Sequence, residues 1–226
     1  MLVSSLVDLM RGVLDDDGPT PYWPSADLVQ FLDAAQKFFV SLVPDDVISD
    51  LQTITQITLT AAAVGETVGF SNLPTNFFQF RLARIKSGTT FQTADLKRLE
   101  DIYAMERESE GRPTQSAPAC SVWREQLAVY PTPTVDVANG IQLFYLTTVT
   151  SLTTVTDTPM VNENHHPILG EYALYLAWEK VNPDQAVTHL QNFGQYVQGM
   201  GGRWTDRALS QRARPRIAQD EQVQTT

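Results

Sequence analysis

The apolar residues of this chain follow a helical period near both ends and a two-residue period in the middle, which narrowly limits the possible folds. In residues 26–43 and 184–200 apolar side chains recur every three or four positions, as on one face of an α-helix. In residues 126–150 they alternate, as in a half-buried strand. We therefore predict an α+β fold, in which helix pairs from the two ends form a bundle and a β-rich domain is inserted between them.

Two helices are predicted before residue 47. Residues 2–14 have a wide apolar face, typical of a helix that packs on more than one side. The three aspartates at 15–17 precede Gly-Pro and lack calcium-loop spacing, so we interpret them as the end of this helix rather than a metal site. The second helix is predicted to begin with Ser25 as its N-cap and to end before Pro44.

The middle of the chain is rich in Thr, Val and aromatic residues. Asn139-Gly140 is predicted to form a tight turn, because this dipeptide favours positive φ. A charged stretch at 94–108 is predicted to form a short helix. The candidate strands are 53–60, 67–70, 77–85, 126–130 and 141–150.

Helices return in the last third of the chain. One is predicted from Pro167 to Val181, and the next begins with Asn182 as N-cap, Pro183 in the first turn and Gln185 in a capping box. The predicted domains are the N-terminal helices 1–47, the inserted β-rich domain 48–158, the C-terminal helices 159–202 and an Arg-rich tail 203–226.

Charge is distributed unevenly along the chain. The 26 acidic and 16 basic residues give a net charge of −10, which argues against general nucleic-acid binding, because phosphate contacts need clustered cations. Residues 202–216 nevertheless carry five arginines and one acid, a local charge of +4, so the remainder carries −14. This tail is either a solvated terminus or an arm that docks on an acidic partner. The predicted docking residues are Arg203, Trp204, Arg207, Leu209, Arg212, Arg214 and Arg216.

The sequence offers little for catalysis. We find no phosphate loop, nucleophile elbow or convincing acid pair. The single cysteine, Cys120, excludes an internal disulfide and is interpreted as a small buried side chain. The adjacent His165 and His166 diverge and precede a helix, which favours capping or packing over metal binding. No apolar run reaches membrane-spanning length, and the N-terminus does not resemble a secretion signal.

Two helical segments carry a resemblance to a known family. WPSADLVQFLDAAQ at 23–36 and HHPILGEYALYLAWEK at 165–180, with LTTVTDTP at 152–159 before the second, resemble head-to-tail adaptor (connector) proteins of tailed bacteriophages, especially short-tailed ones. The helix–β–helix order extends the resemblance over most of the chain. The β region and the Arg-rich tail are not matched residue by residue.

The resemblance implies a structural protein of the virion, at the interface of head and tail, that is assembled in the host cytoplasm. It also implies a protein that is not an enzyme and has no cofactor. Such adaptors form a ring of twelve below the portal protein and extend the DNA channel. They also offer an attachment surface to tail nozzle or tail tube proteins. DNA would pass through without specific binding, and no membrane would be involved.

Two other functions are compatible with the residues. A binding module of the tail or baseplate, for carbohydrate or protein, could use Trp123 or Tyr130 as an aromatic platform. A small metallo-hydrolase could use His165, His166 and nearby acids. Metal analysis of the purified protein separates the metallo-hydrolase from the adaptor, and a binding assay or the location of the chain in a particle separates the binding module.

Overall fold

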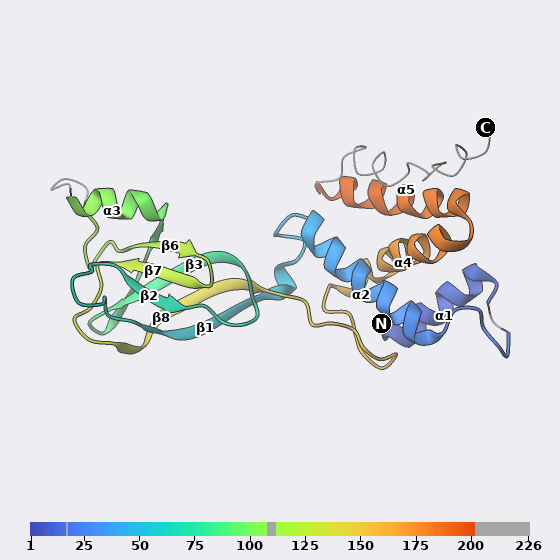
Figure 1. The fold of residues 1–226 in the computed structure, drawn as a ribbon, viewed down its shortest axis with the longest axis horizontal. Coiled ribbons are helices and arrows are strands. Elements are labelled where there is room, and N and C mark those ends of the chain that lie inside the picture. The colour runs from blue at the N-terminus through green and yellow to red at the C-terminus, as the bar shows by residue number, and fades with distance from the viewer. Residues whose placement is uncertain (17, 108–111, 202–226) are drawn as a thin grey trace, which may run out of the picture. The chain divides into compact units, whose positions relative to one another are not determined.

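The computed structural model describes residues 1–16, 18–107 and 112–201, and it has the predicted mixed α+β composition (Figure 1). The chain divides into two compact units. In the described part of the chain, a helical unit comprises residues 1–50 and 149–201, and a β unit comprises Leu51–Thr148. The β unit is therefore inserted between the two parts of the helical unit.

The helical unit is organised around one buried helix, α4 (His166–Val181). This helix contacts α1 (Val3–Leu14), α2 (Ser25–Leu42) and α5 (Pro183–Gly199) (Figure 1). A short 3-10 turn, η2 (Glu163–His165), precedes it. Because α4 is apolar around most of its circumference, it is stable only with neighbours on several sides. Within residues 1–16, 18–107 and 112–201, no helix is long and apolar enough to cross a membrane.

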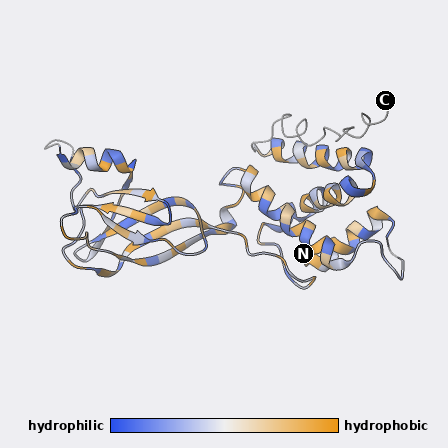
Figure 2. Cartoon of the chain, in the orientation of Figure 1, coloured by the Kyte–Doolittle hydropathy of each residue, from blue (hydrophilic) through white to orange (hydrophobic). Residues whose placement is uncertain are grey.

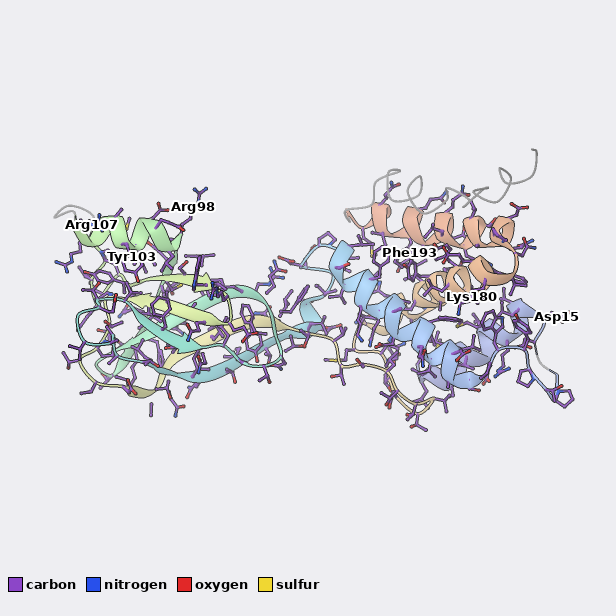
Figure 3. The ribbon with its side chains drawn as sticks, in the orientation of Figure 1. Asp15, Arg98, Tyr103, Arg107, Lys180 and Phe193 are labelled. Carbon is purple, nitrogen blue, oxygen red and sulfur yellow. The ribbon has the colours of Figure 1, made fainter. Side chains whose placement is uncertain are left out.

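Aromatic rings fill the centre of the helical unit. Phe39 of α2 and Phe193 of α5 are fully buried, and Figure 3 shows Phe193 pointing from α5 towards α4. The ring of Tyr172 on α4 lies 5.0 Å from that of Phe193 and 4.7 Å from that of Phe38, centre to centre. These contacts join α2, α4 and α5 in one core, although α2 and α5 are far apart in the sequence.

The β unit contains two four-stranded sheets. The first has the order β1 (Gln52–Leu59), β8 (Val137–Thr147), β3 (Phe77–Ser87) and β4 (Thr90–Thr93). The second has the order β2 (Gly69–Asn72), β7 (Gln126–Tyr130), β6 (Ala119–Trp123) and β5 (Asp95–Leu96). Neighbouring strands are antiparallel except for β5 and β6.

Two apolar clusters hold the β unit together. The first lies between the sheets and includes Ile141 and Leu143 of β8 with Leu127 of β7. The second joins β2, β6 and β7 to α3 (Leu99–Arg107), whose Ile102 is fully buried. The alternation of hydrophobic and hydrophilic residues along the strands is visible in Figure 2.

The predicted strands correspond to β1, β2, β3, β7 and β8, with ends shifted by a few residues. The sequence analysis missed β4, β5 and β6. The first two are very short, and Ala119, Cys120 and Ser121 of β6 are all buried, so that strand does not alternate. The predicted helix at 94–108 begins only at Leu99, because Asp95 and Leu96 pair with β6.

Asn139-Gly140 does not form a hairpin turn, and this prediction is wrong. The dipeptide lies inside β8, where Asn139 has a φ of 52° and the register with β1 shifts between Ile57 and Leu59. A Cβ atom on Gly140 would lie 2.6 Å from the Cβ of Leu59. The glycine is therefore needed for a close approach of β1 at a strand irregularity.

Two predicted helix caps also differ from the structure. The N-cap of α2 is Pro24, and the Ser25 hydroxyl instead accepts a hydrogen bond of 3.0 Å from Arg11. Asn182 does occupy the N-cap position of α5, but its side chain makes no capping hydrogen bond. The end of α1 is as predicted, since Asp15 follows Leu14 in the left-handed conformation.

Candidate assembly surfaces

The two segments that carry the family resemblance meet in the helical unit. The ring of Trp23 lies edge-on to Phe31 of α2, 5.6 Å away. The Lys180 ammonium, near the end of α4, lies 5.0 Å from the centre of the Phe31 ring and 5.5 Å from that of Trp23 (Figure 3). Cation–π contacts at partly exposed sites contribute about 0.5–1 kcal/mol. This group fastens the beginning of α2 to the end of α4.

The two adjacent histidines lie at the opposite ends of α2 and α4, where His165 contacts α2. The His165 ring lies 5.3 Å from Phe39, and its Nδ1 is 3.0 Å from the Tyr196 hydroxyl of α5. His166 is fully buried, with Nε2 2.9 Å from the Val161 carbonyl. Burial lowers the pKa of His166 and so favours its neutral form. Both side chains have the packing role that the sequence analysis favoured.

The remaining candidates for metal or redox chemistry lie apart. His189 pairs with Glu171 at 2.9 Å, on the contact between α5 and α4. Cys120 is buried in the β unit, where desolvation, with a smaller contribution from Asp95, raises its thiol pKa to about 12. Among the residues that the structure describes, no three His, Cys, Asp or Glu side chains are grouped so that they could hold a metal ion.

Residues 149–162, which lead from the β unit back to α4, are attached to α2 by polar side chains. Gln36 is fully buried, and its Nε2 donates to the Thr150 carbonyl at 2.8 Å while its Oε1 accepts from the Met160 amide at 3.4 Å. Asp33 accepts from the Leu152 amide at 2.9 Å. The sequence analysis missed this role, although a glutamine within the apolar stripe of a helix is itself a signal of a buried hydrogen bond.

The same segment also contacts α1. The amides of Val3 and Ser4 donate to the carbonyls of Asp157 and Val155, at 3.0 and 2.8 Å. The Asp157 carboxylate accepts hydrogen bonds from the amide and hydroxyl groups of Thr153 and Thr154. These hydrogen bonds lower the pKa of Asp157 to about 2. Residues 149–158, which the predicted boundaries place in the insertion, thus lie with the helices, because their backbone pairs with the first turn of α1.

The acidic end of α1 closes the loop to α2. The Asp16 carboxylate accepts from the amides of Tyr22 and Trp23, at 2.6 and 2.9 Å. The Arg11 guanidinium donates to the carbonyls of Asp16 and Trp23. Asp16 therefore orders a loop, in agreement with the interpretation of the aspartates as a helix end.

One face of α1 is exposed and largely apolar. Val3, Leu6, Val7 and Met10 are buried within the helical unit. Leu2, Leu9 and Val13 are 49, 52 and 46% exposed, and the hydrophobic colour of α1 is visible in Figure 2. Ser5 and Gly12 lie beside them on the helix surface. We call these residues (Leu2, Ser5, Leu9, Gly12 and Val13) the α1 outer face. The wide apolar face predicted for residues 2–14 thus has one buried and one exposed side.

The β unit has an open, mostly apolar cleft of about 900 Å³ beside α3. We call it the α3 cleft. Its walls come from the beginning of β3, from β5 and α3, and from β6. They include Phe78, Leu96, Arg98, Met105 and Val122.

The two predicted aromatic platform residues have different environments. Trp123 is exposed at the end of β6, but the Arg124 guanidinium lies over its ring at 5.7 Å. Tyr130 is buried, and its hydroxyl accepts a hydrogen bond from Arg112. Tyr130 therefore cannot serve as a platform, and one face of Trp123 is occupied.

The negative charge belongs almost entirely to the helical unit. Residues 1–50 and 149–201 contain fourteen Asp or Glu and three Lys or Arg, a formal charge of −11, whereas 51–148 carry −1. The three cations are engaged: Arg11 with Asp16, Lys37 with Asp33 at 2.6 Å, and Lys180 over aromatic rings. The predicted docking residues from Arg203 to Arg216 lie outside the described residues.

Packing contacts, an exposed apolar helix face, an apolar cleft and a strongly divided charge are features of a structural assembly protein. The family model described as SU10 adaptor protein matches residues 1–218, and the chain belongs to this family. The resemblance to phage head-to-tail adaptors is therefore confirmed. Its members are structural proteins of bacteriophage particles that contact other phage structural proteins, and they are in general not enzymes. A search of curated proteins found no match.

Proposed function

We propose that this adaptor forms a ring of twelve copies below the portal protein. The ring extends the DNA channel and offers an attachment surface to tail nozzle or tail tube proteins. It forms in the host cytoplasm and stays at the head–tail interface of the virion, without catalysis or a cofactor. The helices from the two ends of the chain act as one bundle, which carries the ring. Family membership and the division of charge support this proposal.

The charge of the helical unit is the observation that supports a channel most directly. A formal charge of −11 with only three cations, all engaged, leaves a surface that repels DNA phosphates. Binding to DNA would instead need free lysines and arginines on the channel wall. A helical unit that lines the channel lets the genome slide without adhering.

The Arg-rich tail supplies the attraction to the portal that the acidic helical unit lacks. Guanidinium groups form bidentate hydrogen bonds with carboxylates, and apolar side chains add anchoring that charge alone does not provide. The proposed docking residues are Arg203, Trp204, Arg207, Leu209, Arg212, Arg214 and Arg216.

Deletion of residues 203–226 tests the docking role. We expect the shortened chain to keep its melting temperature and to lose binding to the portal protein in a pull-down. Deletion of 217–226 alone, which removes no arginine, is the matched control and should bind like the full chain. Equal binding by both deletions would show that the tail is only a solvated terminus, and a lower melting temperature would place it in the core.

Ring formation is tested by mass measurement as a function of salt. Twelve copies carry a formal charge of −120, so repulsion opposes assembly without a partner. Salt screens this repulsion over a Debye length of about 8–10 Å, and we expect larger assemblies as salt rises or when portal is added. A chain that stays monomeric at every salt concentration, even with portal present, is not a ring-forming adaptor.

A further inference from the structure

We propose that the α1 outer face of one copy docks in the α3 cleft of the next copy. This inference rests on the proposed ring and names the two surfaces that build it. Both surfaces are exposed and apolar in the single chain, and each belongs to a different unit. A ring needs this arrangement, since it is built from two different patches that meet head to tail, whereas one self-complementary patch yields a dimer.

The α1 outer face has the composition of a helix that enters a groove. Leu2, Leu9 and Val13 follow one another at intervals of seven and four residues, so they align along one side of the helix. A Cβ atom added to Gly12 would meet no atom within 4 Å apart from the neighbouring backbone of its own helix, so the surface around this residue is open in the single chain. Ser5 and Gly12 are small, so a partner can approach the helix closely.

The α3 cleft offers a matching apolar lining. Phe78 and Leu96 are 42 and 58% exposed, and Met105 of α3 lines the same cleft. Methionine adapts its shape readily to a helix that packs against it. With a volume of about 900 Å³ the α3 cleft has room for several side chains of a helix.

Charge favours this contact over a contact between the α1 helices of two copies. Two helical units at −11 each would repel one another if α1 docked on α1. Lys97, Arg98 and one acid, Asp101, line the α3 cleft, and Figure 3 shows Arg98 pointing outward at the beginning of α3. In the part of the chain that the structure describes, neither cation forms an ion pair. They complement Asp8, the exposed acid on α1.

Two full-length variants, mixed, test the pairing. Leu9→Asp disables the α1 outer face and leaves the α3 cleft intact, whereas Leu96→Asp does the reverse. We expect each variant alone to lose ring formation with portal. Removing a buried Leu contact weakens association by roughly 10- to 100-fold. Mixed in equal amounts without portal, the two should form a 1:1 dimer, detected by analytical ultracentrifugation, because one intact pair of surfaces remains.

Val64→Asp in the β unit and Val187→Asp on α5 are matched controls, since both valines are exposed and lie outside the two surfaces. Both should assemble like the original chain, and circular dichroism should show that all four variants are folded. A Leu96→Asp variant that still dimerises with itself through α1 would overturn the pairing. So would rings that survive both Leu substitutions, although the proposed ring would then stand. If the original chain never assembles with portal, the proposed ring itself fails and the pairing fails with it.

Discussion

Replacing Gln36 with Met tests how the chain returns from the β unit to α4. The substitution keeps the length of the side chain and its buried position but removes both polar atoms. The Thr150 carbonyl then loses a donor at 2.8 Å, and the Met160 amide loses an acceptor at 3.4 Å. Both partners belong to the segment that precedes α4, so the change acts on the attachment of this segment to α2.

The expected loss of stability follows from these two hydrogen bonds. Each contributes about 0.5–1.5 kcal/mol net, so Gln36→Met should lower the free energy of unfolding by about 1–3 kcal/mol. Thr150 and Met160 are exposed residues, so their backbone groups can form hydrogen bonds with water in the variant. The loss of stability is therefore smaller than for two hydrogen bonds whose partners are fully buried.

Urea unfolding followed by circular dichroism at 222 nm measures this loss, because the long helices that the structure describes belong to the helical unit. The midpoint should fall with little change in slope. Gln30→Met, on the exposed side of the same helix, is the control and should leave the midpoint nearly unchanged. If the two variants unfold alike, the Gln36 hydrogen bonds do not hold the segment and the argument fails.

Three further predictions concern other parts of the molecule. Phe39→Ala should lower the unfolding free energy by about 3–5 kcal/mol, measured by the same urea titration, because the ring is fully buried; a change below about 1 kcal/mol would contradict its place in the core. The Cys120 thiol, with its pKa raised to about 12, should resist a thiol reagent at pH 8 until the chain is unfolded; rapid labelling of the folded chain would disprove its burial. The Asp157 pKa is lowered from 3.8 to about 2, so its carboxylate stabilises the fold above pH 4 and loses this effect as the pH falls towards 2. Asp157→Asn should therefore unfold more easily at pH 7 and match the original chain near pH 2, whereas an equal difference at both pH values would refute the assignment.

The sequence by itself determined the elements whose signal is local. The apolar spacing of residues 26–43 and 184–200 identified α2 and α5, because a helix shows its buried face as a period of 3.6. A short apolar run that stops at Pro131 identified β7 at its observed bounds, and the aspartates after Leu14 ended α1. The family resemblance also rested on local segments, at 23–36 and 165–180, and these two segments contact each other in the structure.

Only the tertiary structure decided the features that depend on distant partners. The sequence around Ser25 is typical of an N-cap, yet its hydroxyl accepts a hydrogen bond from Arg11 of another helix. Asn139-Gly140 has the sequence of a turn, yet β1 passes so close to Gly140 that the dipeptide is held inside a strand. β5 has two residues and exists because β6 pairs with it.

The division of charge combines both sources. The sequence contains a net charge of −10 and places the arginines near the C-terminus, but it does not say which acids share a surface. Folding brings residues 1–50 and 149–201 into one unit at −11 and leaves 51–148 nearly neutral. The same step buries one side of α1 and exposes the other. Local periodicity shows which residues of a helix are apolar, whereas the number of neighbours, which only long-range packing sets, decides how many of them are covered.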